Sequence, residues 1–365
     1  MIRVLQAVNI MDRAGLETML MNYYRKIDKE QVQFDFLTHR PGKGAYDDEI
    51  LSMGGRVFHA PRLYPQNYKN YDWYMKNFFE EHPEYQIIHA HIDAMSAFPL
   101  YEAKKNRIPI RISHSHTSRL DIDAKLPIKY LAKLAVPKVA NVYCACGEKA
   151  GKFLYREKKF ELIHNAIDLE AFRFDIRKRK IKRAELGIKD ELVIGHVGRY
   201  CYIKNQMFLL DIFGEVLKQR ADAKLLLIGK GEDEAALRKK VSELSLDEKV
   251  LFLLDRSDVK ELYQAMDVFV MPSIFEGLPV VGIEAQANGL PCVISNTISD
   301  EILLTDTVSM LSIKQPARDW AMKILSVSQE RSMTSITQLR DRGYDSETEA
   351  EKLAKWYEEL TKGLS

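Results

Sequence analysis

Residues 267–285 read DVFVMPSIFEGLPVVGIEA and join a short apolar strand to a helix. Glu276 and Glu284 stand eight positions apart in this segment, with the turn Gly277-Leu278-Pro279 between them. The free backbone N–H groups and the positive dipole end of the helix would lie at the carboxyl edge of a sheet, where they favour a phosphate. A carboxylate accepts well from two neighbouring hydroxyl groups, as on a ribose or a hexose. The segment therefore predicts a site for a nucleotide sugar.

The rest of the chain repeats this alternation of strand and helix. We expect strands near residues 2–8, 32–37, 55–59, 86–90, 109–114, 140–145 and 160–163, and then near 192–197, 224–228, 249–253, 267–271, 291–295 and 308–313. In the second half we expect helices to begin around Asn205, Asp233, Asp258 and Val280. Such alternation is typical of parallel, doubly wound sheets, and the composition changes near residue 170. The sequence thus predicts an α/β protein with two domains, 1–170 and 171–345.

Length and composition exclude several classes of protein. The 365 residues are 46% hydrophobic, which is enough to give each of two domains a core. The longest apolar runs, such as residues 225–228, are far shorter than the ~18 residues that cross a bilayer, so we expect no transmembrane helix. Met1 leads directly into a strand without a signal region, which predicts a cytoplasmic protein. The four cysteines, including Cys144 and Cys146, match neither a disulfide framework nor a metal-site spacing, so we expect reduced, structural thiols.

The net charge of +2 conceals two basic segments. Residues 173–183 hold seven basic residues and one acidic residue, and we interpret them as a solvated hinge. No aromatic stacking residues accompany them, so no nucleic-acid partner is expected. Residues 119–138 place Lys125, Lys129 and Lys133 among apolar residues at helical spacing. This second segment is either a basic amphipathic helix for an anionic membrane surface or an ordinary solvated helix.

A loop with two cations follows the predicted strand at residues 192–197. It contains Gly198, Arg199 and Lys204, and it leads into a helix. Departure of a nucleoside diphosphate builds negative charge on the leaving oxygens, and fixed cations lower that barrier. Arg199 and Lys204 are therefore candidates to meet a diphosphate in place of a metal ion.

Two further loops follow neighbouring strands of the second half. Gly229 ends one strand in a Gly-Lys-Gly-Glu turn, where a nucleotide could approach the backbone closely. Arg256 follows the next strand and precedes a helix that we expect Asp258 to cap.

The segment with Glu276 and Glu284 closely resembles the Glu-x7-Glu motif of the family 4, or group 1, retaining glycosyltransferases of the GT-B fold. The resemblance implies two Rossmann-like, doubly wound domains that face each other across a cleft. It places the acceptor on 1–170 and the nucleotide sugar on 171–345. It also implies that a C-terminal helix at 346–365 crosses back onto the first domain.

The resemblance gives roles to the residues of this motif. Glu284 resembles the carboxylate that binds the ribose diol, and Glu276 resembles the one that faces the transferred sugar. The backbone N–H groups of Gly277 and Leu278 would serve the sugar or the phosphate. This chain has Glu-Gly-Leu-Pro-Val where many relatives have Glu-Gly-Phe-Gly-Leu, so the sugar contacts differ in detail.

Other loops resemble further parts of the family's donor site. Arg199 and Lys204 stand where the family holds the donor phosphates, and the loop with Arg256 stands where the backbone meets the base. Gly15 lies in a turn that resembles the family's Gly-Gly-x-Glu turn, with Ala14 in place of the first glycine. Gly15 would let the backbone approach the diphosphate, while Ala14 argues against a positive φ at its own position. A simple strand-to-helix turn is the alternative.

Two pairs of histidines end predicted strands of the first half, His89 with His91 and His114 with His116. Alternate strand residues face the same side, so each pair could hold a metal, but no cysteine or carboxylate spacing completes such a site. Relatives have a histidine near the sugar at a strand end of the first domain, and His116 or His114 matches it best. Either could donate to a group that gains charge in the transition state. His91 is assigned with His114 to the acceptor side.

Asp121-Ile122-Asp123 is similar to the Asp-x-Asp motif with which glycosyltransferases of a different fold hold a divalent ion. Here it precedes the amphipathic segment in a different architecture, and we interpret it as coincidence. We therefore expect no metal ion and no cofactor, and only a nucleotide sugar as a bound small molecule.

The resemblance covers nearly the whole chain and implies a retaining glycosyltransferase. It implies transfer of a hexosyl unit from a UDP-sugar to a hydroxyl of a saccharide or lipid-linked saccharide, as in bacterial exopolysaccharide or capsule assembly. Retention would proceed by same-face attack, while the leaving phosphate takes the acceptor proton. Lipid-linked acceptors would bring the protein to the inner face of the cytoplasmic membrane.

Two other functions use a similar site. A UDP-sugar epimerase of the same two-domain architecture would make the same diphosphate contacts, and a non-catalytic nucleotide-sugar binding protein would also keep a cleft. A hydride-transfer enzyme is disfavoured because no Gly-x-Gly-x-x-Gly follows a predicted strand.

Overall fold

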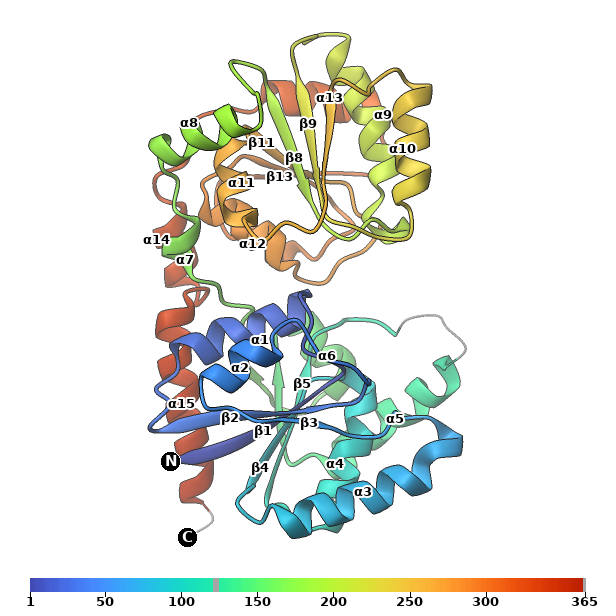
Figure 1. The fold of residues 1–365 in the computed structure, drawn as a ribbon, viewed down its shortest axis with the longest axis vertical. Coiled ribbons are helices and arrows are strands. Elements are labelled where there is room, and N and C mark those ends of the chain that lie inside the picture. Colours follow the sequence, from blue (N-terminus) through green and yellow to red (C-terminus); the bar gives the residue numbers. More distant parts are fainter. Residues whose placement is uncertain (121–124, 364–365) are drawn as a thin grey trace. The chain divides into compact units, whose positions relative to one another are not determined.

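The computed structural model describes residues 1–120 and 125–363, so the Asp121-Ile122-Asp123 motif lies outside the described residues. The chain divides into two compact units (Figure 1). Unit 1 comprises Met1–Ala166 together with Asp345–Ser365, and unit 2 comprises Ile167–Tyr344.

Unit 1 is built on a parallel sheet of seven strands, in the spatial order β3-β2-β1-β4-β5-β6-β7. The strands are β1 (Ile2–Val8), β2 (Val32–Thr38), β3 (Val57–His59), β4 (Ile87–Ala90), β5 (Ile110–Ser115), β6 (Val142–Ala145) and β7 (Glu161–Leu162). The strand order reverses between β1 and β4. Open α/β sheets bind their ligands at such a switch point, beyond the carboxyl ends of the strands.

Helices cover both faces of the unit 1 sheet. One face, with Val4 and Phe34, packs against α1 (Gly15–Lys26), α2 (Asp47–Ser52) and α15 (Ser346–Lys362). The other face, with Leu5 and Ile88, packs against α3 (Tyr68–Glu81), α4 (Ala97–Lys105), α5 (Leu126–Val139) and α6 (Glu148–Tyr155). Because successive strand residues point to opposite sides, apolar neighbours such as Val4 and Leu5 supply two separate cores.

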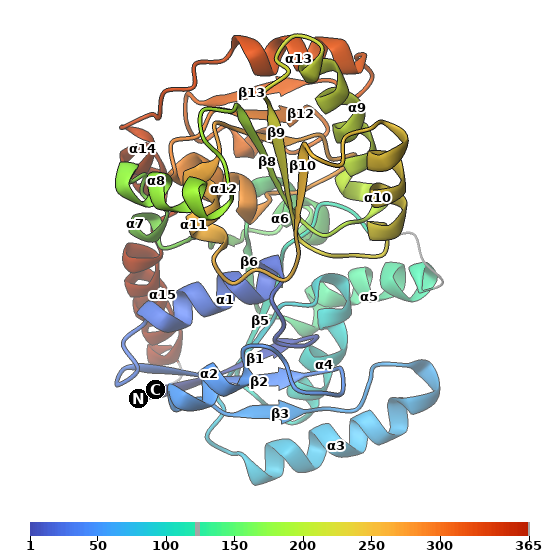
Figure 2. The same cartoon turned by 45° about the horizontal axis from the view of Figure 1, so that its top comes forward.

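The helix α15 joins unit 1 after the chain has passed through unit 2. Asp345 caps its start by accepting a hydrogen bond from the backbone N–H of Glu347. Tyr357 is fully buried and meets Phe34 edge to face, with the ring centroids 6.1 Å apart. Lys26, the last residue of α1, pairs with Glu347 across 2.8 Å. The helix therefore lies alongside α1, as Figures 1 and 2 show in dark red and blue.

Unit 2 contains a parallel sheet of six strands, in the order β10-β9-β8-β11-β12-β13. The strands are β8 (Val193–Val197), β9 (Lys224–Ile228), β10 (Val250–Leu253), β11 (Val268–Met271), β12 (Cys292–Ser295) and β13 (Val308–Leu311). Here the order reverses between β8 and β11, which makes the gap between their carboxyl ends the expected ligand position.

Helices again lie on both faces of this second sheet. One face packs against α9 (Gln206–Leu217), α10 (Glu234–Glu243) and α13 (Ala317–Ser326). The other packs against α7 (Leu169–Phe172), α11 (Val259–Ala265), α12 (Val280–Ala287) and α14 (Ser335–Asp341). α8 (Ile176–Glu185) is joined by hydrogen bonds to the end of α11 and the start of β11.

The basic residues 173–183 lie within unit 2 and do not form a hinge, although Arg173, Arg177, Lys178 and Lys180 are exposed to solvent as expected. Most of them lie on α8, and Arg183 is only 7% exposed. Its guanidinium donates to the carbonyl oxygen of Ala265 and to the carboxylate of Asp267, while Arg179 pairs with the same carboxylate at 2.5 Å. Asp267 is buried at the start of β11, and a buried carboxylate needs cationic partners. The two arginines supply them.

The predicted fold class, α/β with two doubly wound parallel sheets, is confirmed. Each predicted strand is present, and its ends lie within two residues of the expected ones. The helices of unit 2 begin at Gln206, Glu234, Val259 and Val280, within one residue of the expected starts. Among the described residues, no helix has both the length and the apolar character that crossing a bilayer requires.

Candidate functional site

The loops after β8 and β11 meet at the switch point of the unit 2 sheet. The backbone N–H of Ile274 donates to the carbonyl oxygen of Ile203 at 2.8 Å, and the Asn205 side chain donates to the carbonyl oxygen of Pro272 at 3.0 Å. Asn205 adopts a left-handed φ of 57°, which lets the chain turn directly into α9. The two loops are thus fixed against each other.

Lys204 and Glu276 face each other across these loops. Lys204 Nζ lies 2.5 Å from Glu276 Oε1, and the two side chains are only 17% and 16% exposed. The hydroxyl of Ser273 donates to the same carboxylate oxygen at 3.1 Å. Partial burial strengthens the attraction, because water screens it less. Both contacts fall on Oε1, which leaves Oε2 to accept from a hydroxyl of a ligand.

Glu284 lies on α12, where its Oε2 accepts a hydrogen bond from the Tyr263 hydroxyl at 2.8 Å. Burial raises the pKa of Glu284 to about 7 and outweighs the hydrogen bond, which lowers it. The carboxyl group therefore changes its charge near neutral pH. A ligand that donates two O–H groups to it would favour the ionised form.

The turn between the two carboxylates is formed by Gly277, Leu278 and Pro279. The Leu278 side chain is buried in the apolar core with residues of α12, so a ligand can meet this residue only through its backbone. Pro279 occupies the position before α12 with φ of −72° and has no N–H to donate. Gly277 is partly exposed and precedes them both.

Gly198 and Gly229 bring the loops after β8 and β9 together. The N–H of Gly198 donates to the carbonyl oxygen of Ile228 at 2.9 Å. Gly229 has φ of +141°, and a Cβ on it would lie 2.1 Å from the carbonyl oxygen of Gly198. A side chain at position 229 would therefore force the two loops apart.

Arg199 lies on the outer side of the loop after β8. Its guanidinium pairs with Glu232 at 2.9 Å, and the two side chains are 71% and 56% exposed. Exposed ion pairs contribute little and exchange partners readily. Arg199 can therefore turn from Glu232 to an incoming anion at small cost.

Arg256 forms a two-point ion pair with Asp258, at 2.6 Å from Nε and 2.5 Å from Nη2. Asp258 also accepts from Lys182 Nζ at 2.9 Å. Hydrogen bonds from Arg256 and then Lys182 hold the pKa of the Asp258 carboxyl far below its usual range. Asp258 stands just before α11 but makes no side-chain cap, so the expected capping role was wrong. The Asp258 carboxylate instead accepts hydrogen bonds from Arg256 and Lys182.

Three residues of unit 2 that contact the predicted site were not assigned a role from sequence. Ser273 stands three positions before Glu276, and that spacing was the available signal. Tyr263 and Glu232 carried no such signal in the sequence. The contact of Tyr263 depends on how α11 packs beside α12, and that of Glu232 depends on how neighbouring loops meet.

A pocket with a volume of about 550 Å³ opens at the carboxyl edge of the unit 1 sheet, lined by the loops after β1 to β5 and by the start of α5. Its basic lining residues are Arg40, Arg62, Arg119, Lys125 and Lys129. Among the described residues, Asp93 is its one lining carboxylate, and Asp93 Oδ1 accepts from the backbone N–H of His116 at 2.8 Å. Basic side chains gathered in this way suit an anion such as a phosphate.

Gly15 is the first residue of α1 and precedes Leu16, which lines the pocket. A Cβ on Gly15 would meet nothing within 4 Å, so the backbone is open there. Ala14 is extended, with φ of −130°, as its side chain predicted. Glu17 is buried in the first turn of α1, and burial raises its pKa to about 7.

His91 and His116 line the pocket and bond to each other, with Nδ1 of His91 3.1 Å from Nε2 of His116. His91 Nε2 lies 2.8 Å from Gln6 Oε1, and because an amide oxygen only accepts, this ring nitrogen carries the proton. Burial lowers the pKa of His116 to about 3, so its ring is neutral at physiological pH. His114 is fully buried and is not among the lining residues.

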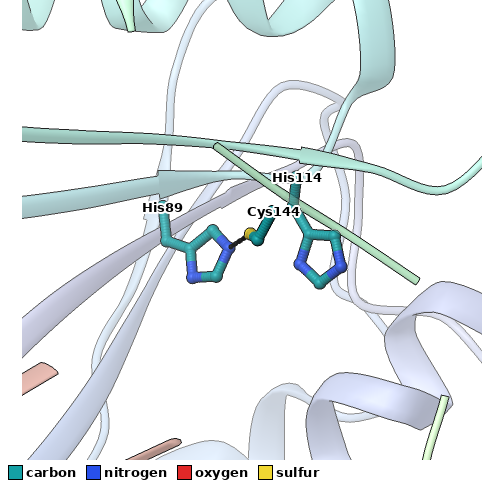
Figure 3. Close-up of side chains that lie close together, drawn as sticks. All are labelled: His89, His114 and Cys144. Atoms are coloured by element: carbon teal, nitrogen blue, oxygen red, sulfur yellow. Dashed lines mark hydrogen bonds between the residues drawn. The ribbon is translucent and has the colours of Figure 1, made fainter. Parts of the chain in front are cut away.

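His114 lies instead with His89 and Cys144, which project from neighbouring strands (Figure 3). His89 Nε2 is 3.3 Å from Cys144 Sγ, and His89 Nδ1 is 2.6 Å from the Tyr357 hydroxyl. The spacing of the sequence did not connect Cys144 with the histidines, because its place beside His114 depends on the register of β5 and β6.

Two family models match the chain. The model described as Glycosyl transferases group 1 matches residues 178–344, within unit 2. The model described as Glycosyltransferase Family 4 matches residues 13–171, most of which belong to unit 1.

Named relatives agree with these matches. The chain is 38% identical over 333 residues to the putative glycosyltransferase EpsF of Bacillus subtilis (strain 168), covering 88% of this chain and 86% of that protein. It is 29% identical over 235 residues, 60% of each chain, to the UDP-Gal:alpha-D-GlcNAc-diphosphoundecaprenol alpha-1,3-galactosyltransferase of Escherichia coli. The solved structure of Anabaena Alr3699/HepE in complex with UDP has a TM-score of 0.82 at 17% identity, covering 98% of this chain and 100% of that chain. This last likeness concerns the fold alone.

Proposed function

The chain belongs to the group 1, family 4 glycosyltransferases of the GT-B fold, and on that premise we propose that it is a retaining enzyme of polysaccharide biosynthesis. It transfers a hexosyl unit from a UDP-sugar to a hydroxyl of a saccharide or lipid-linked saccharide. Unit 2 binds the donor and unit 1 binds the acceptor. The names of the Bacillus and Escherichia relatives support this assignment, as does the UDP in the Anabaena structure.

The observation that carries the proposal is the pair of Lys204 and Glu276 at the unit 2 switch point. A nucleotide sugar presents a diphosphate and several hydroxyl groups within a few ångströms of each other. Lys204 meets the diphosphate while Glu276 accepts from a sugar hydroxyl. The phosphate and sugar groups of one ligand thus replace the ion pair between Lys204 and Glu276. Glu284 accepts from the ribose hydroxyls.

The chemistry follows from these positions. The bond between sugar C1 and the diphosphate oxygen breaks, its electron pair leaves with UDP, and the acceptor oxygen bonds to C1 on the same face. Lys204 and Arg199 stabilise the charge on the leaving diphosphate, which is the role a metal ion plays elsewhere. The acceptor proton passes to the leaving phosphate. Transfer therefore needs neither a covalent nucleophile nor a metal ion.

The acceptor side rests on the basic pocket of unit 1. Its positive charge suits the phosphates of a diphosphate-linked saccharide, the kind of acceptor that the name of the Escherichia relative states. His91 and His116 stand in its wall as neutral hydrogen-bonding groups. Gly15 contributes open backbone at the start of α1.

The lipid of such an acceptor would bring α5 to an anionic membrane surface. Tyr130, Leu131 and Leu134 are exposed on this helix, with Lys129 before them and Lys133 among them in sequence. Apolar side chains flanked by lysines are typical of helices that lie in the headgroup region. Flotation with vesicles containing anionic lipid checks this: the wild type should float, and Leu131→Glu should lower the bound fraction.

The experiment that tests the transfer activity measures release of UDP from a panel of UDP-sugars, with and without a diphosphate-linked saccharide. We expect release to depend on the acceptor and to fall at least tenfold in Glu276→Gln. Glu243→Gln, at the exposed end of α10, is the matched control and should leave release unchanged. Undiminished release in Glu276→Gln would contradict the assignment. A changed sugar without an acceptor would instead indicate an epimerase.

A further inference from the structure

Three potential metal ligands lie together on one face of the unit 1 sheet. They are His89 of β4, His114 of β5 and Cys144 of β6, and all three are fully buried. The strands are neighbours, and their register pairs His114 directly with Cys144. One ligand atom from each residue lies within 4.8 Å of the other two. Figure 3 shows the two imidazoles beside the thiol.

Two of these atoms already have the separation of ligands that share an ion. His89 Nε2 lies 3.3 Å from Cys144 Sγ. In a tetrahedral zinc site, with Zn–N of about 2.0 Å and Zn–S of about 2.3 Å, such atoms lie about 3.5 Å apart. Imidazole and thiolate are also the ligands that Zn²⁺ prefers.

His114 provides an independent observation. Both of its ring nitrogens are buried, and their contact with the backbone of Ile163 falls outside normal hydrogen-bond geometry among the described residues. A neutral imidazole has one N–H, which can turn to the Ile163 carbonyl, and one acceptor nitrogen, and burying that acceptor without a donor costs free energy. Its neighbour His89 has a partner on each nitrogen. A cation bound to the acceptor nitrogen of His114 would remove most of that cost.

The surroundings of His89 are those of a metal ligand. Its Nδ1 is 2.6 Å from the hydroxyl of Tyr357, which fixes the ring and directs Nε2 toward Cys144. Histidines that bind metals generally use their second nitrogen for such a contact, and it holds the ring in position. Tyr357 in turn lies 3.4 Å from Gln6 Nε2.

We propose that His89, His114 and Cys144 bind one zinc ion, which ties β4, β5 and β6 of unit 1 together. The ion accepts lone pairs from His89 Nε2, a ring nitrogen of His114 and the Cys144 thiolate, and the thiol proton leaves to solvent. The site differs from the expectation of reduced thiols without a metal, because the third ligand comes from a separate strand. It stabilises unit 1 and takes no part in sugar transfer.

Cobalt substitution tests the site in the full chain. The protein is stripped with a chelator under reducing conditions and then titrated with Co²⁺. We expect one equivalent to bind, with a near-ultraviolet charge-transfer band from the thiolate that Zn²⁺ removes. Zn²⁺ should also raise the thermal unfolding midpoint of the stripped protein, because it binds the folded state.

Single variants assign the ligands. Cys144→Ser should lose the charge-transfer band, and His114→Asn should weaken Co²⁺ binding at least tenfold. Cys146→Ser, two residues along the chain, should keep the band and serves as the matched control. His91→Asn should keep it too, because His91 belongs to the neighbouring trio of His91, His114 and His116.

Two results would overturn the proposal. One is a folded wild-type protein, judged by circular dichroism, that shows no charge-transfer band with Co²⁺. The other is a band that survives Cys144→Ser, or Co²⁺ binding without any thiolate band, which would place the ion on the histidines alone. The wild-type spectrum decides the matter even if a variant does not fold.

Discussion

The carboxyl edges of the two sheets balance their charges in different ways. In unit 2 the cations are paired with carboxylates. The pairs are Lys204 with Glu276, Arg199 with Glu232 and Arg256 with Asp258. In unit 1 five basic side chains line one pocket with a single carboxylate among the described lining residues, and the nearby histidines are neutral.

This difference indicates two kinds of anion binding. A ligand of unit 2 would have to separate cations from carboxylates, and the proposed nucleotide sugar carries phosphate groups for the one and hydroxyl groups for the other. The pocket of unit 1 gathers five basic side chains, and their positive charge can steer a phosphate toward it from a distance. We therefore expect the affinity of unit 2 to depend on which polar groups a ligand carries. The affinity of unit 1 for its ligand should depend more on ionic strength.

The largest effect should come from breaking the central pair of unit 2. Lys204→Met removes the cation that we propose meets the leaving diphosphate, and we expect kcat to fall about 100- to 1,000-fold. Steady-state measurement of UDP release checks this. Lys218→Met, whose exposed ion pair with Glu215 lies on the far end of α9, should change kcat little. If kcat fell equally in the two variants, the pair of Lys204 and Glu276 would have no specific role in transfer.

Next in size is the loss of charge from the unit 1 pocket. Replacing Arg40 and Arg62 by glutamine should raise the acceptor KM about tenfold for each charge that contacts a phosphate. The donor KM should stay as it is, because we propose that the donor binds to unit 2. Added salt should raise the acceptor KM of the wild type more than that of the variant.

Lys76→Gln, on the exposed surface of α3, is the control for the pocket variants. If a pocket variant weakened donor binding and acceptor binding equally, the proposal that unit 2 binds the donor and unit 1 binds the acceptor would be contradicted.

A third comparison uses pH. Burial raises the pKa of Glu284 from 4.5 to about 7. Because the ionised form is the one proposed to accept the ribose hydroxyls, donor affinity should fall about tenfold as the pH drops from 8 to 6. Isothermal titration with UDP measures this. Tyr263→Phe removes a hydrogen bond that lowers the pKa, so it should move the midpoint to higher pH.

The same group affects stability with the opposite sign. Its pKa is higher in the folded state, so the folded protein holds the proton more tightly. The contribution of Glu284 is thus fully present below pH 4.5 and is lost as the pH rises toward 7. A flat donor affinity between pH 6 and 8 would contradict the role of Glu284 at the ribose.

The smallest effect should come from the exposed pair of unit 2. Glu232→Gln releases Arg199 from a partner that contributes little, so donor affinity should rise or fall by less than about threefold. The unfolding midpoint in urea should stay within error of the wild type. A large loss of affinity would mean that Glu232 itself contacts the ligand.

Much of the fold was predictable because it depends on local patterns. Alternating apolar strands and amphipathic helices gave the two doubly wound sheets, and helix starts such as Val280 followed from the turn before them. The loops that follow strands were also predictable as ligand positions, since parallel strands end at one edge. That Lys204 follows one strand and Glu276 another was visible in the sequence.

What could not be predicted depends on which elements become neighbours. The contact of Lys204 with Glu276 requires β8 beside β11, and that of Cys144 with His114 requires the register of β5 and β6. Asp258 has the sequence of a helix cap, but Arg256 and Lys182 offer its carboxylate stronger partners. Local patterns cannot rank such competing partners.

The position of α15 has a consequence for biosynthesis. This helix belongs to unit 1, yet the ribosome makes it only after all of unit 2. Until then the nascent unit 1 lacks Tyr357, so Phe34 and His89 have no cover on that side. Unit 2 can close its own core first, although it starts later in the chain. Unit 1 is therefore synthesised first but completed last. The side of its sheet that α15 later covers is the part of the nascent chain where we expect chaperone binding.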